Sequence, residues 1–314
     1  MSRARHTAVF ALITVAALAL AGCADPAEEP GTAAGKAAAD GRGGTPATDV
    51  VSSVRQDEAA AKLLPADVRS AGALRVATGL GSPPGGFYEK DGRTVAGADI
   101  DFSDAAAKVL GLELKREAAS FEAILPALGS GRYDLGTGNF GVTEERLKTV
   151  DFVTYINDGQ GFAVRDDSRL TKVTDLARLC GLTVGTTAGT TFEVTLEENR
   201  DRCAEEGEKP YEVKTYADQA AVWLSLRQGR SDVVMSTING LRYAAGQQEG
   251  LRFLNEFKRL DVGFAFKKGS PLTPAFQAAV NRLKEDGTYD RILKKWGTTE
   301  SAIETSRISP PELK

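Results

Sequence analysis

Residues 125–138 read LPALGSGRYDLGTG, and residues 224–237 read LSLRQGRSDVVMST. Both stretches have an apolar, helix-like end, then Gly-Arg, one further residue, an Asp and a strand-like run. A helix followed closely by a strand is the repeating unit of α/β folds. We interpret the two stretches as equivalent elements of two similar lobes. The alternative is coincidence, since helix-turn-strand units are common.

The chain before and after the first stretch alternates between strand-like and helix-like patterns. Strands are predicted at 73–80, 112–118 and 133–139, and helices at 98–111, where Gly111 closes the helix, and at 121–131. This alternation predicts an α/β fold with mainly parallel sheets, in which ligands bind beyond the carboxyl ends of the strands.

A second pair of similar segments is GFAVR (161–165) and GFAFK (263–267). We interpret them as two extended crossings between the lobes. About 100 residues lie between them, the size of one compact unit. The segment 273–298 then predicts two helices, broken by Gly287 and anchored by Trp296, that return to the first lobe. The expected domains are lobe 1 at 58–162, an inserted lobe 2 at 163–263, and the rest of lobe 1 with a tail at 264–314.

The N-terminal segment has the pattern of an export signal. Arg3 and Arg5 precede an apolar run from Ala8 to Leu20, too short to span a bilayer. Leu20-Ala21-Gly22-Cys23 resembles the lipobox of bacterial lipoproteins, which implies a signal peptide at 1–22 and lipidation of Cys23. The alternative is an ordinary signal with a chance cysteine. Residues 23–57, poor in large apolar side chains, are expected to form a disordered tether.

Composition excludes several classes of function. The only histidine, His6, lies in the predicted signal, so we expect no histidine-activated nucleophile, no histidine-bearing zinc site, no metal and no cofactor. Asp and Glu number 43 against 39 Lys and Arg, two of which belong to the signal. This acidic balance without a basic stripe argues against nucleic acid as a partner.

Two cysteines remain beyond Cys23. Cys180 precedes the strand-like LTVGTT, and Cys203 ends the helix-like TTFEVTLEENRDRC. A helix that returns antiparallel to its strand brings its end back to the start of the strand, so we predict a structural disulfide between Cys180 and Cys203. A metal site would need more ligands than these two.

From Leu74 to Gly297 the chain resembles the family 3 solute-binding proteins of ABC importers, of the polar-amino-acid type. The resemblance rests on GADIDFSDAAAKVLG, on FEAILPALGSGRYDL followed by VTEERLKTVDF, on VGTTAGTTFE and on DRILKKWG, in that order. It implies two α/β lobes, joined by two hinge strands, that close on a small ligand. The implied partners are the ligand and the subunits of an ABC permease, and a monomer is expected.

The stretch GTGNFGVTEER (136–146) is the predicted carboxylate site. Bare backbone at Gly138 and Gly141 can present main-chain N–H groups, Thr143 is a good helix N-cap, and Arg146 can fork onto both carboxylate oxygens. Asn139, between the two glycines, is also predicted to bind the ligand. The resemblance implies that the carboxylate-binding arginine of the family is Arg146. The alternative is a surface arginine paired with Glu145 or Asp151.

Lobe 2 offers a matching set of donors in TTAGTTFE (186–193). The resemblance implies that Thr191 binds the same carboxylate and that Thr187 lines the cleft, whereas Thr190 fits plain helix capping equally well. It also implies that Phe121 stacks on the ligand, with ordinary core packing as the alternative.

The chain departs from the family where α-amino acids are held. The usual ammonium-binding aspartate is replaced in VVMSTI by Ser236 and Thr237, and an early aspartate and aromatic by Gly79 and Ser82. An unpaired ammonium in a closed cleft is costly. Either another acid, Asp158 or Glu122, takes over, or the ligand lacks a free ammonium, as hydroxy acids, keto acids and opine-like compounds do.

The leading hypothesis is therefore a binding protein rather than an enzyme: a lipid-tethered, extracytoplasmic receptor that delivers a small carboxylate-bearing solute to an ABC permease. An enzyme similar to cyclohexadienyl dehydratase, which shares this fold, would need a general acid or base in the cleft. A sensory binding module without a permease is the third hypothesis.

Overall fold

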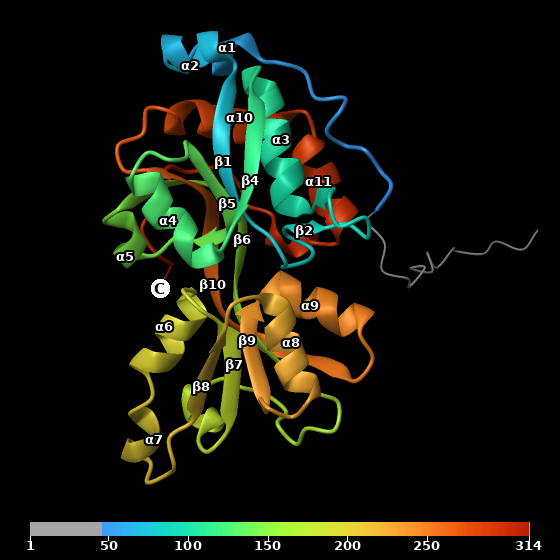
Figure 1. The fold of residues 1–314 in the computed structure, drawn as a ribbon, viewed down its shortest axis with the longest axis vertical. Helices are drawn as coiled ribbons and strands as arrows, with labels where there is room; N and C mark the ends of the chain where they lie inside the picture. Colours follow the sequence, from blue (N-terminus) through green and yellow to red (C-terminus); the bar gives the residue numbers. More distant parts are fainter. Residues whose placement is uncertain (1–45, 314) are drawn as a thin grey trace, which may run out of the picture. The chain divides into compact units, whose positions relative to one another are not determined.

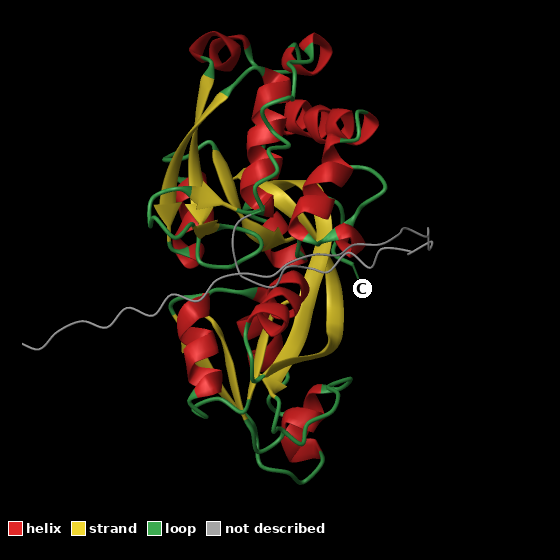
Figure 2. Ribbon diagram, turned by 90° about the vertical axis from the view of Figure 1, so that its right-hand side faces the viewer, coloured by secondary structure: helices red, strands yellow, loops and turns green. Residues whose placement is uncertain are grey.

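Two long antiparallel strands organise the fold. β6 (Val150–Arg165) and β10 (Leu251–Lys267) pair along most of their length and continue from one group of elements into the other (Figures 1 and 2). The computed structural model in which they are seen describes residues 46–313. The two strands occupy the middle of a mixed eight-stranded sheet with the order β4-β1-β5-β10-β6-β9-β7-β8. The predicted two-lobed α/β class is confirmed, with one continuous sheet running through both lobes.

Lobe 1 is built on the parallel strands β1 (Ala73–Gly79), β4 (Glu113–Ala119) and β5 (Leu135–Gly141). Its main helices are α3 (Ala98–Leu110), closed by Gly111 in the left-handed conformation, and α4 (Phe121–Gly129). These elements lie close to the predicted ranges. The smaller ones are α1 (Glu58–Ala61), α2 (Ala66–Ala71), β2 (Phe87–Tyr88), β3 (Val95–Ala96) and α5 (Glu144–Leu147).

Lobe 2 repeats the plan with the parallel strands β7 (Thr183–Thr187), β8 (Glu212–Tyr216) and β9 (Val233–Thr237). The helices of this lobe are η1 (Leu176–Leu179), α6 (Thr191–Glu198), α7 (Arg202–Glu205), α8 (Gln219–Arg227) and α9 (Ile238–Gln247). The two quoted sequence repeats therefore occupy equivalent places, since α4–β5 in lobe 1 corresponds to α8–β9 in lobe 2.

The chain returns to lobe 1 after β10. α10 (Thr273–Glu285) and α11 (Thr288–Trp296) are separated at Gly287, as predicted, and η2 (Thr299–Ser301) comes next. The tail then runs back along the long strands. Ile308 bridges to Val153, Arg307 pairs with Asp261, and Glu312 pairs with Lys258.

The hydrophobic clusters locate the crossings. On β6, Tyr155 and Ile156 pack in the main cluster of lobe 1, whereas Phe162 belongs to a cluster of lobe 2. On β10, Phe257 packs against lobe 2 and Val262 against lobe 1. The chain therefore crosses a few residues before GFAVR and before GFAFK, and each of these echoed segments lies just beyond its crossing. The domain boundaries at 162/163 and 263/264 stay predictions to within these few residues.

The predicted tether is too long at its C-terminal end. Val50 and Val54, both placed in it by composition, are buried in the main cluster of lobe 1. Three valines, Val50, Val51 and Val54, in an otherwise polar stretch are a weak signal in the sequence, yet all three pack on the main cluster of lobe 1. The predicted signal peptide, Cys23 and the residues up to 45 lie outside the described residues. In the described part of the chain, no helix has the length and hydropathy of a membrane span.

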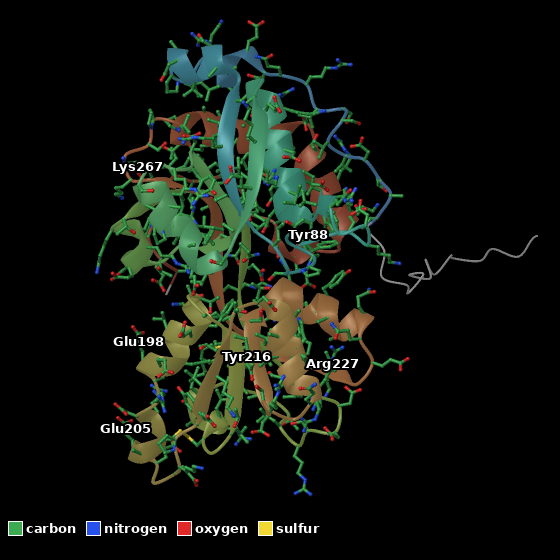
Figure 3. All side chains as sticks on the ribbon, viewed as in Figure 1. Tyr88, Glu198, Glu205, Tyr216, Arg227 and Lys267 are labelled. Atoms are coloured by element: carbon green, nitrogen blue, oxygen red, sulfur yellow. A yellow bond between two sulfur atoms is a disulfide. The ribbon has the colours of Figure 1, made fainter. Side chains whose placement is uncertain are left out.

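The predicted disulfide between Cys180 and Cys203 is present, with Cα atoms 5.6 Å apart. Figure 3 shows its yellow bond in lobe 2, close to Glu205. The single helix expected over residues 190–203 is instead two helices, because the chain turns between Glu198 and Arg202. Cys203 therefore lies on the short α7, and it is buried.

Candidate ligand-binding site

A cavity of about 280 Å³ lies between the lobes. Lobe 1 lines it with the end of β1, the start of α4 and the end of β5, and lobe 2 lines it with the ends of β7 and β9 and the start of α8. Pockets for drug-sized molecules measure roughly 300–1,000 Å³. The cavity is therefore suited to a solute of about the size of an amino acid.

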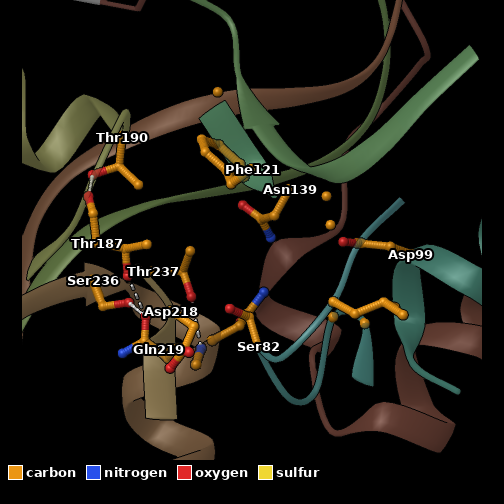
Figure 4. A pocket seen from close by; sticks show the side chains of 18 of the residues that line it. Ser82, Asp99, Phe121, Asn139, Thr187, Thr190, Asp218, Gln219, Ser236 and Thr237 are labelled. Carbon is orange, nitrogen blue, oxygen red and sulfur yellow. Dashed lines mark hydrogen bonds between the residues drawn. The ribbon is translucent and has the colours of Figure 1, made fainter. Parts of the chain in front are cut away.

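Every residue predicted for the ligand site lines this one cavity. These residues are Phe121, Asn139, Gly141, Arg146, Thr187, Thr191, Ser236 and Thr237. Figure 4 shows the threonines and Ser236 gathered on one side of the space and Phe121 and Asn139 on the other. The structure brings the set together, and its role in ligand binding stays a prediction.

Among the described residues, Arg146 is the one basic side chain on the cavity wall. Its Nη1 donates to the carbonyl oxygen of Gly141 (3.0 Å) and its Nη2 to that of Gly189 in lobe 2 (3.3 Å). The guanidinium carbon lies 5.7 Å from the ring centre of Phe121 and 5.8 Å from that of Phe140, a cation–π arrangement. Burial lowers the pKa of Arg146 to about 10, so the group remains charged at neutral pH.

The alternative of a surface ion pair for Arg146 is wrong. Glu145 pairs with Lys148, and Asp151 pairs with Lys268 at 2.8 Å. Within residues 46–313 no carboxylate lies within ion-pair distance of Arg146. A half-buried cation whose hydrogen bonds go only to neutral carbonyl groups can accept an anionic partner from outside the protein.

The end of β5 has an unusual backbone that shapes the cavity. Gly138 has φ of 152° and Asn139 has φ of 58°, and both angles are rare for side-chain-bearing residues. A Cβ atom at Gly138 would be in van der Waals contact with the main chain of Gly79, at 3.4 Å, so the positive φ rather than a lack of space favours glycine here. The side chain of Asn139 is held by a hydrogen bond from its Nδ2 to Asp158 (3.1 Å).

One part of the predicted carboxylate site is wrong. Thr143 does cap α5, since its Oγ1 accepts from the amide of Arg146 (3.2 Å), but α5 has only four residues. The amide of Glu144 donates to the Glu312 carboxylate (3.0 Å). The tail therefore occupies the helix terminus that was expected to hold the ligand, and Arg146 is left as the predicted anion-binding group of this segment.

In lobe 2, α6 begins at the cavity wall. Thr190 is its N-cap, and Gly189 donates its main-chain amide to the side chain of Glu193 (2.7 Å), which completes a reciprocal cap. This is the capping alternative for Thr190. Thr191, the first residue of α6, faces the cavity, and its carbonyl oxygen accepts from Gln160 (3.2 Å).

Gln219 lies at the lobe 2 wall and was not predicted. Its Oε1 accepts from Ser236 (2.9 Å) and from Thr187 (3.4 Å), whereas its buried Nε2 has no hydrogen-bond partner among the described residues. A buried donor without a partner is uncommon, and one on a cavity wall fits an acceptor on a ligand. The only signal in the sequence was its place directly after Asp218, a helix-capping residue.

The acids that were candidates for an ammonium partner do not line the cavity. Asp158 is buried behind Asn139 and accepts from Asn139 and from the main-chain amide of Asn239 (3.2 Å). Glu122 lies beside Gly189, outside the lining set. Thr237 is the N-cap of α9, with its Oγ1 accepting from Gly240 (3.0 Å).

Asp99 lines the cavity, and the sequence analysis missed it. It is 2% exposed, and its Oδ1 accepts from the hydroxyl of Tyr155 (2.7 Å). Burial raises the pKa of Asp99 to about 6, although the hydrogen bond from Tyr155 works in the opposite direction. In the sequence, Asp99 resembles any acid in the first turn of a helix, and nothing local shows that the loop above it is open.

The two lobes meet around the cavity. The bond from Arg146 to Gly189 joins α5 of lobe 1 to the turn before α6 of lobe 2. On α9, Asn239 donates to Asp158 and to Ser301, and Arg242 pairs with Glu300. The predicted site residues of both lobes therefore line one cavity.

The fold and the cavity define a two-lobed α/β protein with a cavity between its lobes. The chain belongs to the bacterial extracellular solute-binding proteins, family 3, whose family model matches residues 74–299. The resemblance stated from the sequence motifs is thereby confirmed.

Several proteins of known specificity are similar to this chain. The arginine-binding protein ArgT of Corynebacterium glutamicum is 32% identical over 256 residues, covering 80% of this chain and 83% of the relative. The L-cystine-binding protein TcyJ of Escherichia coli is 29% identical, covering 73% and 84%.

Two solved structures are similar over nearly their whole length. An ancestral arginine-binding protein bound to arginine has 33% identity and a TM-score of 0.65, with 72% of this chain and 98% of that chain covered. The ancestral amino acid-binding protein AncCDT-1, a precursor of cyclohexadienyl dehydratase, has 29% identity and the same TM-score, covering 73% and 97%.

Proposed function

We propose that this protein is the lipid-tethered, extracytoplasmic substrate-binding protein of an ABC importer and that it binds a small carboxylate-bearing solute, an amino acid or a derivative, by hinge closure. The observation that carries the proposal is the half-buried guanidinium of Arg146, which has no carboxylate partner among the described residues and lines a cavity between two lobes. The partners are the solute and the permease subunits, and the protein acts as a monomer.

The proposed order of binding steps follows from the position of the positively charged Arg146 in lobe 1. Arg146 and the main chain of Gly138–Gly141 belong to lobe 1, so the ligand carboxylate binds there first. Closure then brings Thr191, Thr187 and the unpartnered amide of Gln219 from lobe 2. These donors interact with ligand only when the lobes meet, so ligand stabilises the closed arrangement that a permease would bind.

A ligand panel tests the proposed function. The soluble domain should gain thermal stability with a subset of amino acids, hydroxy acids and N-substituted amino acids, and calorimetry should give one site per chain. A ligand present at a hundredfold excess over its Kd stabilises by about 2.7 kcal/mol. The same compounds as methyl esters, which lack the carboxylate, serve as controls. Binding of the esters as tight as that of the acids would contradict the proposal.

Binding, rather than catalysis, is the proposed activity, in line with the relatives named as binding proteins. The enzymatic alternative draws support from the buried carboxyl group of Asp99 on the cavity wall, a candidate general acid. The panel separates the two, because the bound compound should be recovered unchanged after prolonged incubation. Loss of water or carbon dioxide from a cyclic carboxylic acid would establish the enzyme instead.

The proposed tether rests on Cys23, which lies outside the described residues. Cys23→Ala should move the protein from the membrane fraction to the soluble extracytoplasmic fraction, because acyl chains on this residue are the proposed anchor. Fractionation with immunoblotting measures this, and Cys23→Ser serves as a second variant. Unchanged membrane association in both variants would rule out lipidation at Cys23.

A further inference from the structure

A fully buried carboxyl group lies where β6 crosses from lobe 1 to lobe 2. It belongs to Asp158, and the next residue, Gly159, has φ of 155°. A Cβ atom at Gly159 would lie 2.1 Å from the carbonyl oxygen of Lys258 on β10, so the two long strands are tightly packed at this point. The side chain of Asp158 is therefore held at the hinge between the lobes, behind the cavity wall.

The two oxygens of Asp158 accept hydrogen bonds from different lobes. Oδ2 accepts from the side-chain Nδ2 of Asn139, at the end of β5 in lobe 1 (3.1 Å). Oδ1 accepts from the main-chain amide of Asn239, in the first turn of α9 in lobe 2 (3.2 Å). Burial raises the pKa of Asp158 to about 6, and both hydrogen bonds act in the opposite direction because they favour the ionised group. One carboxylate therefore joins the two lobes.

Both partners of Asp158 lie on the cavity wall. Asn139 has φ of 58°, and a hydrogen bond to its side chain helps to hold this left-handed conformation beside the cavity. In lobe 2, α9 begins directly after Ser236 and Thr237, which line the cavity with Asn239. A shift of either partner would move cavity-lining residues. Asp158 can therefore influence solute binding without touching the solute.

α9 makes two further contacts with lobe 1. The side chain of Asn239 donates to Ser301 (2.9 Å), and Arg242 pairs with Glu300, both partners belonging to η2. The ion pair is exposed, with 38% and 67% of the two side chains accessible, and such pairs contribute little. Hydrogen bonds to a buried charge contribute more. Asp158 is therefore the main polar link between α9 and lobe 1.

We propose that Asp158 is a positioning residue that joins Asn139 of lobe 1 to α9 of lobe 2 and stabilises the closed arrangement, in which the lobes meet, in the absence of a solute. The inference deepens the proposed function and rests on its hinge closure. A solute then binds a protein of which a fraction is already closed, and its apparent affinity rises with that fraction. Loss of the link lowers the affinity for different solutes by the same factor.

Distance measurements on the protein without solute test the proposal. Spin labels on the full chain, at the exposed positions Lys90→Cys in lobe 1 and Glu249→Cys in lobe 2, report the separation of the lobes by double electron–electron resonance. The labelled protein with no other change should show a population at the distance of the structure. Asp158→Ala should lower the ratio of closed to open molecules by about tenfold or more, because two hydrogen bonds to a charged acceptor are lost.

Conservative variants separate the hydrogen bonds from packing. Asp158→Asn should keep a ratio close to that of the wild type, because its oxygen can accept from Asn239 and its amide can donate to Asn139 once that side chain turns over. Asn139→Asp places two carboxyl groups face to face and should favour the open form, whereas adding Asp158→Asn should restore the closed population. Asp151→Ala, on the same strand but paired with Lys268 within lobe 1, is the matched control and should leave the ratio unchanged.

Thermal melting checks the folding of each variant, and if Asp158→Ala does not fold, Asn139→Asp and its rescue decide the question. A ratio that is unchanged in the folded variants, failure of the rescue, or a wild type with only open molecules would overturn the inference. The measurement contains no solute, so the ligand panel tests the proposed function separately. If panel compounds bind in an Arg146-dependent manner while the lobe distances are unchanged, the proposed function stands and this inference fails.

Discussion

Arg146→Ala is expected to abolish or nearly abolish ligand binding while leaving the protein folded. Removing one partner of a desolvated charge pair costs about 3–5 kcal/mol, because the other charge is left buried and unpaired. The affinity should therefore fall by between about a hundredfold and several thousandfold. Calorimetry with the tightest ligand of the panel measures the loss.

The structure explains why the fold should tolerate this substitution. Both hydrogen bonds of the guanidinium go to main-chain carbonyl groups, of Gly141 and Gly189, and no ion pair within the described residues is lost. Arg146→Lys keeps the charge without the planar fork and should lie between wild type and alanine. Arg132→Ala, an exposed arginine 3.6 Å from Glu117 on the same lobe, is the control and should bind normally. Full affinity in Arg146→Ala would remove Arg146 from the site.

Loss of the disulfide should be the largest effect on stability. The bond closes a loop with a sequence separation of 23 residues in lobe 2, which in the chain-entropy model corresponds to about 3 kcal/mol. The double variant Cys180→Ala/Cys203→Ala should melt on the order of 5–10 °C lower than the wild type. Neither cysteine lines the cavity, so ligand affinity should change little.

A reducing agent provides the control for this prediction. It should lower the melting temperature of the wild type towards that of the double variant and leave the double variant unchanged. If reduction lowers the wild type by less than about 1 °C, the disulfide contributes no stability under the conditions tested.

Most elements near the cavity were predictable because their signals are local. The helix at 98–111 follows from apolar spacing and from Gly111, and the break at Gly287 separates two amphipathic helices as expected. The disulfide followed from the count of cysteines and from the return of a helix beside its strand. The prediction of a single helix over 190–203 was wrong because three consecutive polar residues after Glu198 allow a turn as readily as a helix.

Part of the candidate site could be predicted from the sequence for the same reason. Arg146, Asn139 and Gly141 lie within eight residues of one another, so a short motif places all three at the end of β5 and on the short helix α5 that follows it. The contact that the C-terminal tail makes with the N-terminus of α5 could not be predicted from the sequence. Glu312 reaches Glu144 from the C-terminal tail, and no local pattern reports a contact between residues so far apart in the chain.

The alternation of strands and helices, the two-lobed plan and the position of Arg146 just after β5 were predictable from sequence, because each depends on spacing within a short window. That Asp99 faces the cavity and that Asp158 and Glu122 do not became clear from the folded chain alone. Access to a side chain depends on what packs over it, and for Asp99 that is a loop of glycines from a different element.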